Sequence, residues 1–133
     1  MKQHLGAVAL LVPSYEEGLR FYAGTLGFDV VEDTELGPEK RWVLVAPPGS
    51  GGTCLLLARA ASDEERKAIG AQAGGRVFLF LHTDDFARDH KRYSAAGVQF
   101  LEEPRTEPYG TVAVFADPFG NKGDLIERRT RAP

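Results

Sequence analysis

The chain has 133 residues, a formal net charge of −3, and 43% hydrophobic and 26% charged residues, which is typical of one compact globular domain that needs no disulfide. This mildly acidic balance, with Lys and Arg scattered along the chain, argues against nucleic acid as a partner, and no apolar run reaches the roughly 20 residues that span a membrane. The single cysteine, Cys54, excludes an internal disulfide and fits a reducing compartment, so we expect a cytoplasmic protein.

The first half of the chain predicts a strand, a helix and three further strands. Residues 6–12 form a short apolar run closed by Pro13, which is typical of a buried strand. Ser14 and Glu17 have the spacing of a capping box at a helix start, and Gly27 stands where a left-handed helix end is expected. The three strands that follow are predicted over residues 28–32, 41–46 and 53–58.

The second half predicts the same order of elements. Residues 76–82 read as a strand, Thr83 or Asp84 can cap a helix, and Gly97 ends that helix. Three more strands are predicted over residues 98–102, 111–116 and 123–127. Between the halves, residues 61–75 predict a short helical linker, in which Ser62 and Glu65 form another capping box.

Identical residues recur in the two halves at a constant offset of 70 positions, which indicates an internal duplication. These pairs are Gly27 and Gly97, Glu32 and Glu102, and Pro48 and Pro118. We therefore predict a single domain over residues 1–133, built from a unit at 5–60, the linker at 61–75 and a second unit at 76–128. The alternative is an ordinary α+β sandwich whose halves only look alike.

Two segments resemble one known superfamily. The run 13–22 followed by Leu26-Gly27-Phe28 resembles the first helix of vicinal oxygen chelate proteins, and residues 115–121 resemble their F-x-D-P-x-G-N strand and turn. This superfamily comprises the glyoxalases, bleomycin-resistance proteins and extradiol dioxygenases. The resemblance implies an α+β fold in which two tandem βαβββ modules form a cup-shaped, partly closed barrel around a ligand cavity, and it implies a homodimer.

The resemblance also names four metal-ligand positions, one in the first and one in the last strand of each half. The matching residues here are Ala7, Cys54, Phe78 and Asp124, of which only Asp124 offers the hard oxygen that a divalent ion needs. We therefore predict no metal and no other cofactor. A divalent metal held by a relocated set such as His82 and Asp124 is the alternative.

Two polar residues are candidates for chemistry inside the cup. Strand alternation places His82 on the same side as Phe78 and Phe80, where an imidazole can act as an acid, a base or a hydrogen-bond donor. Asp124 should face the cavity with a raised pKa, or be paired with Arg41, Lys122 or a ligand amine. The structural alternatives are a strand-end histidine that bonds the backbone near Thr83, and an aspartate satisfied by backbone or water.

Several further residues are expected to line the ligand cavity. Phe78 and Phe80 would give an aromatic wall, and Trp42 and Tyr109 are candidates to stack on a ligand, Tyr109 from the turn at 108–110. Cys54 is expected as a small buried residue. Aromatic residues of a β-rich domain can equally serve its core, and the cluster of Glu102, Glu103, Arg105 and Glu107 is expected to be solvated surface.

These residues favour a small-molecule-binding protein that takes an apolar or aromatic ligand without a metal, with His82 and Asp124 as polar contacts and Trp42, Cys54, Phe78, Phe80 and Tyr109 around it. The alternative is a lyase, isomerase or dioxygenase of the same superfamily, which uses a relocated metal or acid–base chemistry by His82 and Asp124. A third possibility is an interaction module whose cup is filled by its own side chains.

Overall fold

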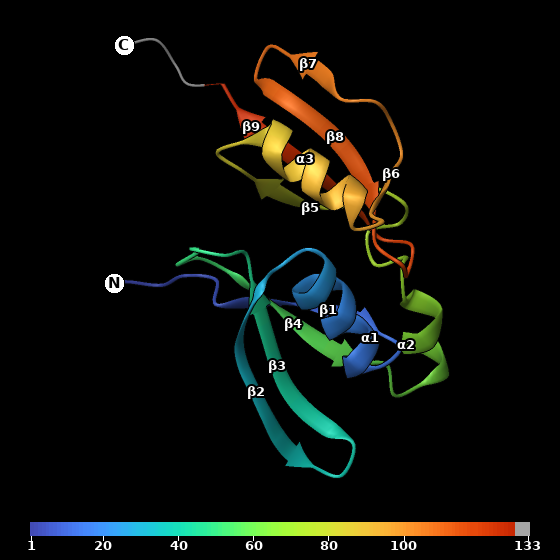
Figure 1. Ribbon diagram of the computed structural model, residues 1–133. Helices are drawn as coiled ribbons and strands as arrows, with labels where there is room; N and C mark the ends of the chain where they lie inside the picture. Colours follow the sequence, from blue (N-terminus) through green and yellow to red (C-terminus); the bar gives the residue numbers. More distant parts are fainter. Residues whose placement is uncertain (130–133) are drawn as a thin grey trace. The chain divides into compact units, whose positions relative to one another are not determined.

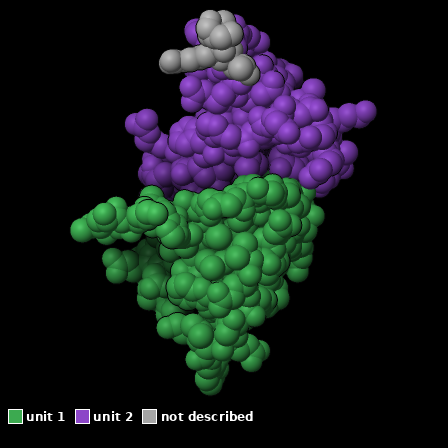
Figure 2. Space-filling view, turned by 90° about the vertical axis from the view of Figure 1, so that its left-hand side faces the viewer, with its two compact units in different colours: residues 1–69 green, residues 70–133 purple. Residues whose placement is uncertain are grey.

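The computed structural model of the protein describes residues 1–129 and contains two compact units, Met1–Ile69 and Gly70–Pro133 (Figures 1 and 2). Their boundary lies inside the predicted linker. That residues 1–133 behave as one domain stays a prediction. Within the described residues, no helix is long and apolar enough to cross a membrane.

Unit 1 is a four-stranded sheet covered on one face by a helical segment. Its strands are β1 (Ala7–Val12), β2 (Asp29–Gly37), β3 (Lys40–Ala46) and β4 (Cys54–Arg59), and its helices are α1 (Tyr15–Leu19), η1 (Arg20–Thr25) and α2 (Asp63–Ala68). The strand order is β1-β4-β3-β2, with β1 parallel to β4 and the other pairs antiparallel. Leu10, Val12, Val43, Val45 and Leu57 are buried under the helical segment together with Tyr22 and Leu26. Strand β2 forms one edge of the sheet and is exposed along its whole length.

The predicted first helix begins as expected and then changes its geometry. Ser14 is the N-cap: its hydroxyl oxygen accepts from the N–H of Glu17 at 3.1 Å, and the hydroxyl donates to the Glu17 carboxylate at 2.9 Å. From Arg20 the helix widens into a π-helical turn, in which the N–H of Leu26 donates to the carbonyl of Phe21 five residues earlier. Gly27 ends it with φ of 78°, as predicted.

Unit 2 repeats the order of elements. It contains β5 (Val77–His82), α3 (Phe86–Ala95), β6 (Gln99–Phe100), β7 (Arg105–Glu107), β8 (Gly110–Ala116) and β9 (Lys122–Arg128). The strand order is β5-β9-β8-β6, and β7 pairs with β8 as well. Leu81, Phe86, Tyr93, Phe115 and Leu125 form the core of this unit. Helix α3 lies across the sheet (Figure 1). Strand β5 starts and ends 70 positions after β1, and β8 does so relative to β3, which confirms the predicted repeat.

Two predictions in unit 2 were wrong. The cap of α3 is Asp85, not Thr83 or Asp84: the Asp85 carboxylate accepts from the N–H of Arg88 at 3.0 Å, and the Thr83 hydroxyl accepts from the N–H of Asp85. The strand predicted over 98–102 shortens to the two residues of β6. It ends there because the N–H of Val114 donates to the Glu102 carboxylate at 3.0 Å instead of to the backbone of this strand. The chain then returns as β7, which the sequence pattern did not predict.

Candidate functional site

The candidate site begins with the face of the unit 2 sheet that points away from α3, called here the far face. Side chains alternate between the two faces of a strand. The residues next to those that pack against α3 therefore point to the far face. These neighbours are Phe80 and His82 on β5, Val112 and Val114 on β8, and Asp124 and Ile126 on β9. Val112 and Ile126 form a buried floor, whereas Phe80 and His82 form an exposed margin along β5.

Asp124 lies where the buried floor meets this exposed margin. The strand register places it between Phe80 on β5 and Val114 on β8. Asp124 is only 9% exposed, and its Oδ1 atom is buried without a hydrogen-bond partner among the described residues. Burial raises the pKa of Asp124, the charge of Arg105 opposes this, and the charge of Glu102 adds to it. The neighbouring ring of Phe80 is 61% exposed.

Glu102 and Arg105 form an ordered cluster near Asp124 rather than the solvated surface that we expected. The Arg105 guanidinium donates to Glu102 at 3.0 Å and to Glu107 at 2.6 Å, and all three side chains are half-buried. These hydrogen bonds, with a further one that Arg105 donates to the Tyr109 side chain, raise the pKa of Arg105. Arg105 thus binds Glu102 and Glu107 rather than Asp124. It therefore does not serve as a hydrogen-bond partner for the Asp124 Oδ1 atom.

His82 and Asp124 share the far face on adjacent strands. His82 lies opposite Ile126 in the register, two residues along β9 from Asp124, so the two side chains are diagonal neighbours. The imidazole is exposed. The N–H of Thr83 donates to the carbonyl of Ile126 at 2.9 Å, so this backbone group does not need a hydrogen bond from the His82 side chain. The geometry therefore leaves His82 available for a ligand.

The register corrects the position assigned to Phe78. Val77 pairs with Lys122 and Leu79 with Gly123, so Phe78 is the extra residue of a bulge, and Phe80 is the residue directly beside Asp124. In unit 1, Ala7 lies directly beside Cys54 in the same way. Phe80, not Phe78, is therefore the counterpart of Ala7. Phe78 is half-buried.

The remaining candidates belong to other elements of the two units. Tyr109 is 42% exposed in the turn between β7 and β8, and contacts Arg105. Cys54 is a half-buried free thiol on β4. Trp42 is 40% exposed on β3. Arg41, proposed as a partner of Asp124, binds Asp33 and Glu16 of its own unit instead, each at 2.6 Å.

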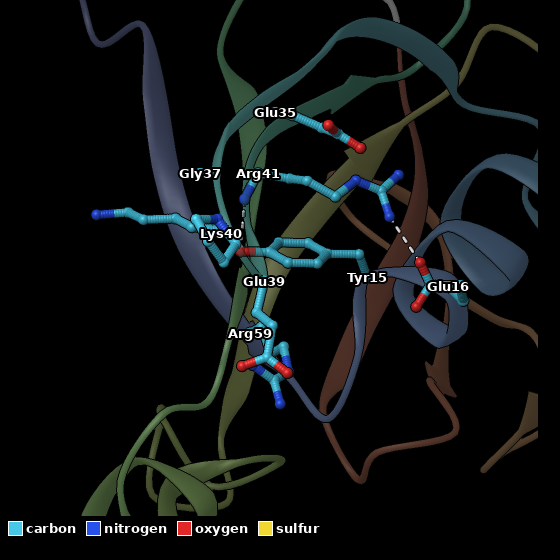
Figure 3. A pocket seen from close by; sticks show the side chains of 9 residues that line it. Tyr15, Glu16, Glu35, Gly37, Glu39, Lys40, Arg41 and Arg59 are labelled. Carbon is cyan, nitrogen blue, oxygen red and sulfur yellow. Dashed lines mark hydrogen bonds and ion pairs between the residues drawn. The ribbon is translucent and has the colours of Figure 1, made fainter.

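Unit 1 contains a cavity that the sequence did not indicate. Strands β3 and β4 pair only from Val43 to Val45. On the N-terminal side of Val43, the β2–β3 hairpin extends away from β4, as Figure 1 shows. We call the opening between Lys40–Trp42 and Ala58–Ala61 the fork. A cavity of about 310 Å³ lies there, and one of about 410 Å³ adjoins it under the hairpin turn (Figure 3).

Tyr15 of α1 closes the base of the fork. Its ring is 7% exposed, and its hydroxyl oxygen accepts from the N–H of Arg41 at 3.1 Å (Figure 3). The Arg41 guanidinium lies 5.1 Å from the centre of the Tyr15 ring. Hydrogen bonds to Arg41 lower the pKa of Asp33, and the same ion pairs raise that of Arg41. The sequence reasoning missed the pairing of Tyr15 with Arg41, because the helix motif at 13–22 does not indicate that the Tyr15 hydroxyl reaches strand β3.

The residues present do not fit the divalent ion of the metal-dependent relatives. At the four matching positions, the side chains with donor atoms are Cys54 in unit 1 and Asp124 in unit 2. Over residues 1–129, no three His, Cys, Asp or Glu side chains gather in a way that could hold an ion. A single thiol and a single carboxylate are not the oxygen- and imidazole-rich set that such ions take.

Two βαβββ units with a repeat offset of 70 residues define a protein of the vicinal oxygen chelate class. The family model of the Glyoxalase/Bleomycin resistance protein/Dioxygenase superfamily matches residues 4–124, and the chain belongs to this superfamily. An uncharacterized protein of Shewanella frigidimarina is 51% identical over 100% of this chain and 99% of its own.

Solved structures support the same assignment. UcmS2 is 30% identical with a TM-score of 0.82, covering 95% of this chain and 98% of its own. TnmS3, described as an antibiotic-binding protein from Streptomyces sp. CB03234, is 31% identical with a TM-score of 0.76, covering 96% of this chain and 98% of its own. These likenesses confirm the predicted superfamily and its α+β fold.

Proposed function

We propose that this protein binds an apolar or aromatic small molecule at the far face of unit 2, without a metal. Phe80 supplies an exposed ring for stacking, Asp124 accepts a hydrogen bond from the ligand, and His82 offers a second polar contact. The observation that carries the proposal is the buried Oδ1 atom of Asp124, which has no partner among the described residues. Trp42, Cys54, Phe78 and Tyr109 remain candidates for further ligand contacts.

An unpartnered buried carboxylate is costly for a folded protein. Leaving a buried acceptor without a hydrogen bond costs about 1–3 kcal/mol, and more for a charged group. A ligand that brings an amine or a hydroxyl to Asp124 removes this cost on binding, while its rings cover the exposed face of Phe80. The site thus favours an aromatic compound with a hydrogen-bond donor. The description of TnmS3 as an antibiotic-binding protein supports a small-molecule ligand.

The Asp124→Asn variant tests the proposal. In a thermal-shift screen of dialysed protein against planar aromatic amines and alcohols, we expect stabilising compounds that lose roughly tenfold or more in affinity in this variant, because Asp124 accepts their donor. Phe80→Ala should weaken the same compounds through lost stacking. A control, Glu103→Gln, removes an exposed carboxylate nearby and should change nothing. Compounds that bind wild type and Asp124→Asn equally would refute the role of Asp124.

Urea unfolding of the Asp124→Asn variant shows whether a loss of ligand binding comes from a loss of folding. The raised pKa means that the folded state holds the Asp124 proton more tightly than the unfolded state does. The contribution of this carboxyl to stability is therefore fully present below its unfolded pKa and is lost as pH rises through the folded pKa. Relative to wild type, the asparagine variant should gain stability in urea unfolding as the pH rises above about 4, the usual pKa of an unfolded aspartate. A loss at pH 7 would contradict this assignment.

The proposal includes a homodimer in the cytoplasm. Large apolar side chains outside the far face and the fork, Leu5, Val8 and Leu101, are exposed and leave apolar area for a second copy. Cys54 is a free thiol, as a reducing compartment allows. Light scattering after size exclusion should give twice the 14.5 kDa chain mass. A mass of one chain at micromolar concentration would refute the dimer.

A second candidate function is acid–base catalysis by His82 and Asp124. Their shared face and the raised pKa of Asp124 favour it, since an acid and a base on adjacent strands can serve one substrate. Turnover of a bound compound that His82→Gln abolishes, with binding retained, would support catalysis. Metal analysis of the same dialysed protein separates both candidates from a metal-dependent enzyme.

A further inference from the structure

We propose that the fork in unit 1 is a second ligand site, which binds an aromatic carboxylate. It lies in the other unit from Asp124, and its chemistry is opposite, because it offers hydrogen-bond donors where the far face of unit 2 offers an acceptor. Figure 3 shows the charged part of this region around Tyr15 and Arg41.

The fork exists because the ladder between β3 and β4 stops. Where two strands pair, side chains of the two sheet faces are kept apart. Beyond Val43 and Leu57 no ladder separates them, so Tyr15 from the α1 side and Trp42 from the opposite side line one cavity. The Tyr15 hydroxyl replaces the missing strand as the acceptor for the N–H of Arg41. The buried Tyr15 side chain therefore keeps β3 and β4 apart at the fork.

The walls of the fork suit a flat apolar ring. They are formed by apolar and aromatic side chains and the stems of charged ones: Tyr15, Trp42, Leu56, Leu57, Ala58 and Ala61. The cavity of about 310 Å³ lies at the lower end of the range for small-molecule sites. A two-ring compound of that size can lie between the Trp42 indole and the side chains of β4.

The polar groups of the fork are mainly donors. The hydroxyl hydrogen of Tyr15 and the charged groups of Lys40 and Arg59 have no acceptor within residues 1–129. Arg41 is already neutralised by Asp33 and Glu16 and takes no part. Glu39, the sole carboxylate of the lining, sits in the turn with φ of 60°. Two uncommitted cations against one carboxylate favour an anion at the rim.

Trp42 makes the site directly observable, because it is the single tryptophan of the chain. Protein labelled with 5-fluorotryptophan gives one fluorine resonance, located in the fork. Titration with 2-naphthoate should shift this resonance saturably, while the uncharged 2-naphthamide should bind roughly tenfold more weakly or worse. Equal binding of the acid and the amide would overturn the proposal, and so would an unmoved resonance at millimolar 2-naphthoate.

Charge variants test the rim without touching the core. Arg59 is exposed, so Arg59→Gln should fold normally and weaken 2-naphthoate roughly tenfold. Lys67→Gln removes the same charge from α2, outside the fork, and should leave the titration unchanged. Equal effects of the two variants would show a general charge effect and overturn the site. Retention of the fork signal in Asp124→Asn separates this proposal from the function proposed for unit 2.

Discussion

Replacing Gly70 by alanine should lower the free energy of unfolding by roughly 3 kcal/mol. Gly70 adopts φ of 76°, a left-handed conformation, and a Cβ atom there would lie 1.9 Å from the carbonyl oxygen of Phe119. That oxygen belongs to the backbone of a tight turn and cannot rotate away as a side chain would. Urea unfolding followed by circular dichroism measures the loss.

Gly74→Ala is the matched control. Gly74 also has a left-handed φ, of 63°, but nothing lies within 4 Å of the position of its Cβ. This variant should lose only the conformational cost of about 1 kcal/mol. The difference between the two variants isolates the contact with Phe119. Equal losses would mean that the close approach of these two backbone segments does not persist in solution.

The turn after β8 should be the second most sensitive element. Asp117 is 5% exposed, and its carboxylate accepts from the N–H groups of Phe119 and Asn121 at 2.9 and 2.8 Å. It also accepts from the Asn121 side-chain amide at 2.8 Å. Asp117→Ala leaves these buried donors without an acceptor and should cost about 3 kcal/mol. The thermal unfolding midpoint and urea unfolding both report this loss.

Asp117→Asn distinguishes the hydrogen bonds from the mere presence of a polar side chain. Its carbonyl oxygen can still accept from the two backbone N–H groups, but its amide faces the amide of Asn121, donor against donor. We expect an intermediate loss, which a second change, Asn121→Asp, should partly recover by restoring a donor and an acceptor. A single variant as unstable as Asp117→Ala, with no recovery in the double variant, would refute this account of the turn.

The elements that the sequence predicted best are those with local signals. Ser14 and Ser62 cap helices as their spacing to a glutamate indicated, since each hydroxyl oxygen accepts from the N–H three residues later. Gly27 and Gly97 both adopt the left-handed φ expected of helix ends. The motif D-P-F-G-N was recognisable for the same reason, because its hydrogen bonds join residues at most four positions apart.

The features that the sequence missed depend on how strands lie side by side. The bulge at Phe78 shifts β5 against β9, so Phe80 rather than Phe78 lies beside Asp124. Gly123 of β9 lies opposite Leu79 at this shift, but one glycine within a strand pattern does not fix how two strands pair. The fork likewise depends on where the β3–β4 ladder stops, and the Tyr15 hydroxyl that fills the gap is 26 positions from Arg41 in the sequence. Such pairings are set by packing in three dimensions rather than by local pattern.

Strand β2 has an unpaired edge, which in other proteins is a common starting point for aggregation. Four of its nine residues carry a carboxylate: Asp29, Glu32, Asp33 and Glu35. Two copies that approached edge to edge would bring these negative charges together, so the strand repels its own kind although Val30 and Val31 are exposed on it. The acidity of this one strand thereby disfavours edge-to-edge growth into fibres at the place where its open backbone would favour it.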